Sequence, residues 1–312
     1  MWKKARRLLR RPFETGGFVL LKWIIPVLPR GMVVGLSKLA GRIAWLLPLR
    51  EKRIGLKNID AVFGDAKTAT EKRFILTTSF TTFTQTMLDV FWFSRNPEKR
   101  IPKYVEIDPG FESLFQDKAN ICITAHFGNW ELTTQTLALR GVDISAIAAT
   151  VKNQAVDQIL VQQREKTGQT IIPQKGALRT LVARLRKNGK VGFVLDQTTS
   201  EQEGGIMVDF LGLPMLASAA PAALAYRTGT ELFFGFCKPL PNGKYRLYST
   251  GILQPPAFDK ERNADAVARE LTQQIIDRVS SEIRKHPEFW LWSYKHWRRT
   301  PGKTYPPNYP NY

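Results

Sequence analysis

Short apolar runs and segments of helical spacing alternate through the middle of the chain. Runs of strand length lie at 120–125, 144–149, 170–172, 190–196, 231–236 and 245–250. Apolar residues three and four apart mark helices at 71–93, 130–140, 154–166, 177–187, 218–228 and, before Pro287, 267–283. This alternation predicts an α/β fold with a mixed, mostly parallel sheet flanked by helices. The turn Pro241-Asn242-Gly243 predicts that the last two strands pair antiparallel as a hairpin.

The first 53 residues differ from the rest of the chain in charge and pattern. They hold 13 Lys and Arg against two acids, a net charge of +11 within a whole-chain charge of +19. The run Gly16 to Leu28 is short for a spanning helix, which needs about 20 apolar residues, and it contains Lys22 and Pro26. The next segment is amphipathic and places on one face Leu36, Leu39, Ala40, Ile43 and Leu47. We expect a helical segment that lies on an anionic membrane surface; the alternative is a pair of helices that pack into an ordinary core.

Composition sets the remaining boundaries. We expect a membrane-anchoring segment at 1–50, an α/β domain at 51–300 and an extended tail, rich in Pro, Asn and Tyr, at 301–312. The two cysteines, Cys122 and Cys237, lie in apolar runs and are expected in the core. Basic residues suit nucleic acid as well, but the chain contains no recognisable nucleic-acid-binding motif, so no nucleic-acid partner is expected.

The run from Ala125 to Glu131 carries the strongest chemical signal. His126 follows an apolar strand, and Asn129 is a good N-cap for the helix whose first turn contains Glu131. Ligands collect at the carboxyl ends of strands in open α/β sheets. We expect Glu131 to turn back onto one imidazole nitrogen, leaving the other to accept a proton from a hydroxyl. The alternative is a partly buried histidine beside a carboxylate that complements the helix dipole.

Five blocks of sequence carry a family resemblance. They are His126 to Glu131 (HFGNWE), Arg53 to Ile59 with Phe63-Gly64, Leu195-Asp196-Gln197, Val208 to Pro214, and Pro287 to Trp292 with Lys295 and Arg298. With these blocks the chain resembles the lipid A biosynthesis (lauroyl/myristoyl) acyltransferase branch of the lysophospholipid acyltransferase superfamily. It departs from that branch at Tyr294, where many members carry histidine, and at Leu211, where the branch has a second phenylalanine.

The resemblance implies a fold, an activity and a location. The fold is like that of glycerol-3-phosphate acyltransferase, and the reaction is acylation of a lipid A precursor during lipopolysaccharide biosynthesis. The donor is a thioester of acyl carrier protein or coenzyme A, and the acceptor is a membrane lipid at the cytoplasmic face of the inner membrane.

Further polar residues are candidates for substrate binding. Asp196 and Gln197 end one strand, and Lys152 follows another, so the fold brings these positions near His126. An acceptor with phosphates needs cations, for which a bidentate arginine is well suited. In the resembled branch an arginine followed by a glycine, here Arg164 and Gly168, lies in the active-site region. The expected substrate-binding residues are Asn129, Lys152, Arg164, Lys175, Asp196, Gln197 and Asp209. Asp196 is alternatively a structural carboxylate for the loop that follows it, and Asp209 is alternatively an assistant to the base.

The expected mechanism is direct acyl transfer without a covalent intermediate. His126 acts as general base and Glu131 stabilises the imidazolium. The chain offers no Gly-x-Ser-x-Gly elbow, and its other histidines, His286 and His296, lack a recognisable metal-ligand spacing, so no metal or cofactor is expected. Three alternatives stay open: the same chemistry on another glycolipid or lysophospholipid, a thioesterase that uses water, and a non-catalytic lipid-binding scaffold.

Overall fold

A mostly parallel sheet of seven strands forms the centre of the molecule. The computed structural model describes residues 2–148, 151, 153–174, 176–298 and 304–312, with the backbone alone for 2–11 and 13. The strands run in the order β1-β9-β8-β2-β5-β3-β4, and within the sheet only β8 and β9 pair antiparallel among these residues. Their bounds are β1 Val105–Ile107, β2 Asn120–Thr124, β3 Ile144–Ala148, β4 Thr170–Pro173, β5 Lys190–Val194, β8 Leu232–Pro239 and β9 Tyr245–Leu253. The predicted α/β class and the predicted hairpin are confirmed.

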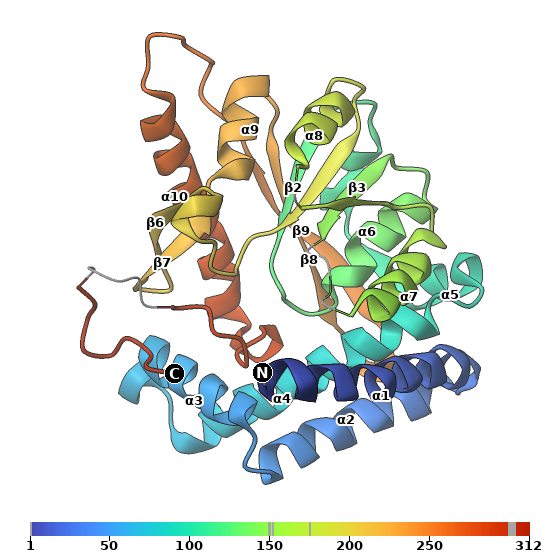
Figure 1. Ribbon diagram of the computed structural model, residues 1–312. Coiled ribbons are helices and arrows are strands. Elements are labelled where there is room, and N and C mark those ends of the chain that lie inside the picture. The colour runs from blue at the N-terminus through green and yellow to red at the C-terminus, as the bar shows by residue number, and fades with distance from the viewer. Residues whose placement is uncertain (1, 149–150, 152, 175, 299–303) are drawn as a thin grey trace.

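Helices cover both faces of the sheet (Figure 1). Side chains alternate across a strand, so Ile121 and Ile123 of β2 pack into one core while Cys122 faces the other. The first core is closed by α8 (Leu178–Leu185), α9 (Ala220–Thr228) and α10 (Ala264–Lys285). The second is closed by α6 (Trp130–Leu139), α7 (Gln154–Glu165) and the carboxyl end of α4 (Ala69–Trp92).

A helical layer lies beneath the sheet and consists of the first part of the chain (Figure 1). It contains α1 (Trp2–Ile24), α2 (Arg30–Leu46), α3 (Arg50–Phe63) and α4, with α5 (Pro97–Tyr104) after it. The axes of α2 and α4 approach closely at Gly41, where an added Cβ would lie 2.1 Å from Thr81 Oγ1. Short 3₁₀ helices lie at Ile25–Val27, Gly64–Ala66, Pro109–Phe115, Glu201–Glu203, Pro241–Gly243 and Pro287–Phe289.

One hairpin is absent from the sequence-based prediction. Strands β6 (Gly205–Phe210) and β7 (Leu213–Ser218) pair antiparallel outside the main sheet, and β6 packs against α10. Their two-residue loop, Leu211-Gly212, takes positive φ at both positions, 56° and 84°, which matches the twist of a hairpin. Leucine rarely adopts this conformation, and for that reason the local sequence gives no hairpin signal.

No single helix among the described residues is long and apolar enough to cross a membrane. The stretches Arg30–Leu46 and Arg50–Ala66 reach the length and hydropathy of a membrane span only when they are taken together, and a bend of 83° separates them. The predicted amphipathic helix at 31–47 is present as α2, whereas its contact with a membrane and the boundary at residue 50 stay predictions.

The carboxyl-terminal tail packs against α3 where it is described. Residues 304–312 form neither helix nor strand. Asn308 Nδ2 donates to the Ala61 carbonyl over 2.8 Å, the Tyr312 hydroxyl bonds Asn58, and Tyr309 is buried. Residues 306–309 form a turn, in which the Tyr309 amide donates to the Pro306 carbonyl over 2.9 Å, and these contacts hold the tail against the helical layer.

We predict that Thr68→Ala lowers the free energy of unfolding by about 1 kcal/mol. Thr68 Oγ1 accepts from the Glu71 amide over 3.2 Å, and Glu71 Oε2 accepts from the Thr68 amide over 2.8 Å, so both groups cap α4. Denaturant titration measures the loss. Thr70→Ala, in the same exposed first turn, is the matched control and should cost nothing. Equal stability of the two variants would show that this capping box does not stabilise α4.

Candidate active site

The parallel pairing of β2 with β5 brings His126 and Asp196 together. Thr124 and Val194 are partners in register at the ends of these strands, and the Leu195 amide donates to the Thr124 carbonyl over 2.9 Å. His126 and Asp196 each follow two residues beyond these partners. Both therefore emerge at the carboxyl edge of the sheet, where ligands bind in open α/β folds.

Asp196 holds the His126 imidazole in a fixed orientation. Its Oδ1 lies 2.7 Å from His126 Nδ1, and its Oδ2 accepts from the His126 amide over 3.1 Å. The carboxylate is fully buried, while the histidine side chain is 21% exposed. An Nδ1–H that donates to the carboxylate leaves Nε2 unprotonated, the form that a general base requires.

Two aromatic residues of the carboxyl-terminal segment, Trp290 and His296, form hydrogen bonds with Asp196. Trp290 Nε1 donates to Asp196 Oδ2 over 2.7 Å. The His296 ring stacks on Trp290 at 4.1 Å, with Nδ1 2.8 Å from the Asp196 carbonyl and Nε2 2.7 Å from the Leu291 carbonyl. Burial lowers the pKa of His296, while the charge of Asp196 and the two carbonyl acceptors oppose that change.

Burial and charge shift the pKa values of His126 and Asp196 in opposite directions. Burial alone lowers the pKa of His126, but the charge and hydrogen bond of Asp196 and the charge of Glu131 outweigh it, so the pKa lies above 6.5. Burial alone raises the pKa of Asp196, but His126 and Trp290 hold it below its usual value. The site thus favours an ionised Asp196 and a histidine that accepts a proton readily.

Glu131 pairs with Arg164 and not with His126. Arg164 Nε donates to Glu131 Oε2 over 2.8 Å, and Nη2 donates to Oε1 over 2.7 Å. The prediction that Glu131 bonds the His126 imidazole is therefore wrong. Asp196, at the end of the adjacent strand β5, bonds His126, and Arg164 of α7 bonds Glu131. Glu131 still acts on His126 through its charge. Arg164, predicted to bind substrate, thus lies against Glu131, and its role in substrate binding stays a prediction.

Gln197 and two aromatic rings lie around the imidazole. Gln197 Nε2 is 3.4 Å from each ring nitrogen of His126. The Trp130 ring meets the His126 ring at a centroid distance of 4.9 Å and stacks on Phe83 at 6.2 Å. Since Trp130 and Phe83 are only partly buried, they form an apolar wall beside the base.

The backbone amides of the turn are all engaged within the protein. His126 donates to Asp196, Phe127 to the Ala125 carbonyl, Gly128 to the Phe289 carbonyl and Asn129 to the Cys237 carbonyl, over 2.7–3.1 Å. Only glycine fits at position 128, where φ is +55° and a Cβ would lie 1.9 Å from the Cys237 carbonyl oxygen. The turn is therefore rigid, and these amides do not form an oxyanion hole.

Asn129 is a structural residue, contrary to the expectation that it binds substrate. It is fully buried. Its Oδ1 accepts from the Leu132 amide over 3.2 Å and caps α6, as the sequence predicts. Its Nδ2 donates to Asp89 Oδ2 over 3.0 Å, which leaves no polar atom of the side chain for a ligand.

Asp209 lies on the β6–β7 hairpin against α10. Its Oδ1 accepts from the Gly212 amide over 2.8 Å, and its backbone bonds Gln273. It lines an open hollow of about 600 Å³ that none of the His126 site residues lines. A role for Asp209 beside the base is not supported by this placement. The candidates Lys152 and Lys175 lie outside the described residues.

Sequence reasoning missed the roles of Trp290, His296 and Asp89. The Pro287–Trp292 block resembles the family motif, but nothing local shows which tryptophan reaches Asp196. Asp89 had a signal: a lone acid in the apolar run Met87 to Trp92 requires a buried partner.

The described residues offer no arrangement for metal or thiol chemistry. They contain no group of three or more His, Cys, Asp or Glu side chains placed to hold a metal ion. Burial raises the pKa of the Cys122 thiol to about 12 and raises that of Cys237 as well, so neither forms a thiolate near neutral pH.

The family model for bacterial lipid A biosynthesis acyltransferases matches residues 4–299. Similar curated proteins include phosphatidylinositol mannoside acyltransferases of Mycobacterium tuberculosis (strain CDC 1551 / Oshkosh), with 30% identity over 169 residues, and of Mycolicibacterium smegmatis, with 26% identity over 190 residues. The matches cover 53% and 60% of this chain, and 50% and 59% of the relatives. The chain thus spans about half the length of the curated relatives that it matches. The family and these relatives are acyltransferases, and the resemblance inferred from the sequence is confirmed.

We predict that Asp196→Asn lowers the pKa of His126. The substitution removes the charge that raises this pKa and leaves the burial that lowers it, so proton affinity falls by roughly tenfold or more. An NMR titration of the imidazole carbon-bound protons measures the change. Glu131→Gln removes a more weakly acting charge and should give a smaller shift in the same direction. An unchanged pKa in Asp196→Asn would exclude the pairing.

Proposed function

Because the chain belongs to the bacterial lipid A biosynthesis acyltransferase family, we propose that it transfers a fatty acyl chain from an acyl thioester to a hydroxyl group of a membrane glycolipid. The single observation that carries the proposal is the His126–Asp196 pair at the carboxyl edge of the sheet. Nδ1 is held by the carboxylate, and within the described residues Nε2 has only the long contact to Gln197.

The proposed reaction needs no covalent enzyme intermediate. His126 Nε2 takes the proton of the acceptor hydroxyl, and the oxygen attacks the thioester carbonyl carbon. The C–S bond then breaks, and the thiol leaves with the proton from the imidazolium. Asp196 stabilises the imidazolium in between, as the orienting carboxylate of a catalytic triad does. This chemistry requires no resident cofactor, and acyl carrier protein or coenzyme A enters only as the donor.

Side chains stabilise the developing oxyanion in this proposal, because the turn amides are engaged. Gln197 Nε2 lies at the base itself, 3.4 Å from both ring nitrogens. Arg164 is positioned by two hydrogen bonds to Glu131, through Nε and Nη2. We assign its Nη1 to an anionic group of the acceptor or to the thioester carbonyl. Glu131 is then a positioning residue for Arg164, and Asp196 takes over the part assigned to Glu131 from the sequence.

An anionic glycolipid is the acceptor that fits both comparisons. The family description points to a lipid A precursor, while the relatives act on phosphatidylinositol mannoside. Both lipids combine sugar hydroxyls with phosphate, which suits a base next to an arginine. We favour a glycolipid of the phosphatidylinositol mannoside kind over lipid A, since the curated relatives share that substrate. A thioesterase would need water in place of the lipid hydroxyl.

We predict that purified protein consumes an acyl thioester only when a glycolipid acceptor is present, and that His126→Ala and Asp196→Ala each lose at least 100-fold in turnover. Mass spectrometry of the lipids identifies the acylated product. A mannosylated phosphoinositide product supports the favoured acceptor, and a phosphorylated glucosamine disaccharide supports lipid A. His286→Ala, on a histidine outside the pair, is the control. Thioester consumption without acceptor would identify a thioesterase, and no His126-dependent consumption would refute the proposed function.

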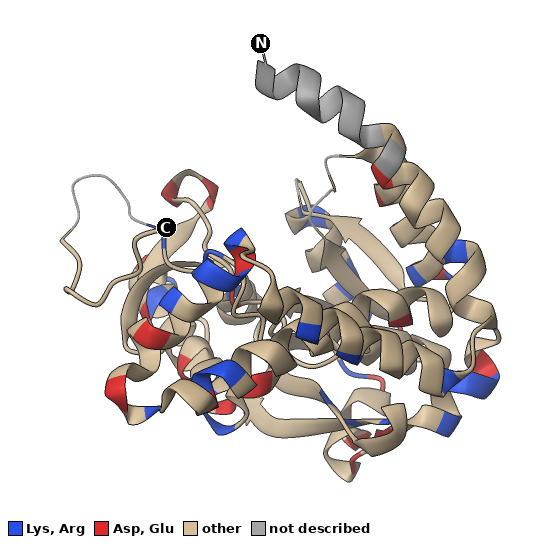
Figure 2. Ribbon diagram, turned by 90° about the horizontal axis from the view of Figure 1, so that it is seen from below, with Lys and Arg blue, Asp and Glu red and all other residues tan. Residues whose placement is uncertain are grey.

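The helical layer supports a membrane surface as the place of action. Viewed from below, α2 is mostly tan with isolated blue positions (Figure 2). Its Val33, Ser37 and Gly41 face the protein. The exposed apolar side chains of α1 and α2, here called the apolar stripe, are Val19, Leu20, Trp23, Ile24, Met32, Leu36, Leu39, Ile43 and Leu46. The exposed Met32, Leu36, Leu39 and Ile43 recur three or four residues apart and so share one face of α2, and we propose that the apolar stripe inserts into the cytoplasmic face of a membrane.

We predict that Leu39→Asn with Ile43→Asn weakens binding to vesicles of anionic phospholipid by at least tenfold. Full burial of each side chain contributes roughly 1.5–3 kcal/mol, so the loss exceeds this threshold even with partial insertion. Vesicle co-sedimentation measures binding. Leu178→Asn, an equally exposed leucine on α8, is the matched control. Vesicle binding that survives the double substitution would exclude the apolar stripe as the membrane contact.

A further inference from the structure

Helix α4 holds the His126 turn through two side chains outside the proposed chemistry. The Thr86 hydroxyl has one proton, which the Gly128 carbonyl at 2.9 Å shares with the Thr82 carbonyl at 3.0 Å, and Asp89 Oδ2 accepts from Asn129 Nδ2 over 3.0 Å. We propose that Thr86 and Asp89 are positioning residues that fix Gly128 and Asn129 and thereby set the orientation of His126 for proton transfer. The inference rests on the proposed function and extends it to residues that touch no substrate.

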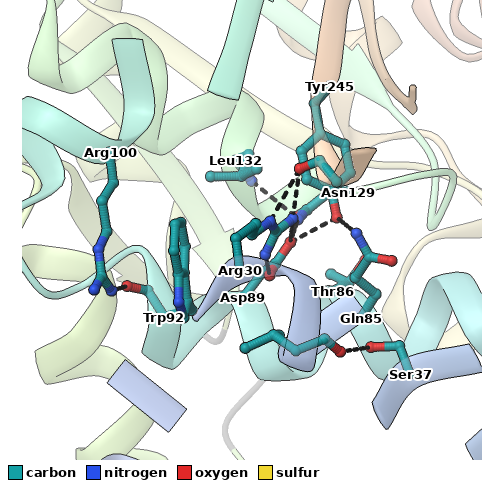
Figure 3. Close-up of polar contacts among 12 residues, drawn as sticks. Arg30, Ser37, Gln85, Thr86, Asp89, Trp92, Arg100, Asn129, Leu132 and Tyr245 are labelled. Carbon is teal, nitrogen blue, oxygen red and sulfur yellow. Dashed lines mark hydrogen bonds and ion pairs between the residues drawn. The ribbon is translucent and has the colours of Figure 1, made fainter. Parts of the chain in front are cut away.

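Asp89 is at the centre of a buried network that joins four parts of the chain (Figure 3). Arg30 of α2 donates to both carboxylate oxygens, and Tyr245 of β9 donates to Oδ2 over 2.6 Å. Gln85 donates to the Tyr245 hydroxyl over 2.8 Å. Arg30 also donates twice to the Gly243 carbonyl, over 2.8 Å and 3.0 Å. Every group around the carboxylate is a donor.

This arrangement favours an ionised Asp89. Burial raises the pKa of Asp89 above its usual value, and the charge of Arg30 with the hydrogen bonds of Arg30, Tyr245 and Asn129 limits the rise. Burial likewise disfavours the Arg30 charge, but Asp89 outweighs it and raises the pKa of Arg30. Arg30 is therefore charged beside Asp89, and each group that bonds the carboxylate donates to it.

The Thr86–Gly128 and Asp89–Asn129 contacts affect His126 because the backbone of the turn is held rigidly. Gly128 and Asn129 follow His126 by two and three residues, and their amides are fixed to Phe289 and Cys237. Asn129 also caps α6, which carries Glu131. On the same helix, Ser79 Oγ donates to the Trp290 carbonyl over 2.5 Å, and Trp290 donates to Asp196. One helix therefore supports both members of the His126–Asp196 pair.

The decisive experiment compares Thr86→Val with Thr272→Val. Both threonines are fully buried, and both hydroxyls bond the carbonyl four residues earlier in their own helix, over 3.0 Å and 2.6 Å. Only Thr86 additionally reaches the turn. We expect Thr86→Val to lower kcat by about threefold to tenfold with each KM within twofold. Thr272→Val should match the wild type, and a Thr86→Val enzyme that also matches it would overturn the inference.

A pH profile separates positioning from loss of folded protein. The charged or titratable groups around His126 are Asp196 after β5, Glu131 on α6, its partner Arg164 on α7, and His296 behind Asp196. Thr86→Val changes none of them. If the turn loosens, the Nδ1 bond to Asp196 weakens, and the acid limb of kcat/KM moves to lower pH. A smaller folded fraction would lower the rate without moving that limb, and this result would contradict positioning.

The Asp89 contact is tested by removing its donor. Asn129→Asp keeps the oxygen that caps α6 but sets two carboxylates against each other, and it should lower kcat at least tenfold. An Asn129→Asp variant with wild-type kcat would overturn the inference. If the wild type shows no acyl transfer that depends on His126, the proposed function is refuted. If the wild type is active and Thr86→Val has the same kcat, only the positioning role is refuted.

Discussion

The buried charge of Asp89 is the constraint on which the arrangement of the molecule depends. An ionised carboxylate without access to water needs donors on all sides, and removal of one partner of such a buried pair costs about 3–5 kcal/mol. The donors come from α2, from β9 and from the cap of α6. Because no single element supplies them, the helical layer, the end of the sheet and the His126 turn must pack together for any one of them to be stable.

The His126 turn lies between two buried carboxylates with different tasks. Asp89 bonds an amide side chain and fixes the backbone, whereas Asp196 bonds the imidazole and sets its protonation. The engaged amides leave the turn little freedom, which preorganises the base before substrate arrives. In the proposed mechanism, the same engagement leaves side chains to stabilise the oxyanion, unlike in hydrolases whose catalytic turn itself provides the oxyanion hole.

Helix α2 connects the surface proposed to contact a membrane with this network. One side of the helix carries part of the apolar stripe, and Arg30 at its amino end bonds Asp89 and the loop before β9. A glycine at the crossing with α4 lets the two helices approach closely enough for side chains of both to meet. The surface assigned to the membrane and the turn assigned to catalysis are thus separated by a single helix, α4, which contacts both α2 and the turn.

The sequence by itself determined the alternation of strands and helices, the α6 cap, the β8–β9 hairpin and the position of His126 at a strand end, because local periodicity and turn chemistry encode these features. It also placed Asp196, Gln197 and Arg164 near that histidine. The pairing was decided by tertiary structure: Glu131 is the nearer acid in sequence, but strand order sets Asp196 against the imidazole and α7 sets Arg164 against Glu131. The Arg30–Asp89 bond likewise spans 59 residues. These long-range contacts depend on which strands and helices pack side by side, and a local sequence pattern does not encode that packing.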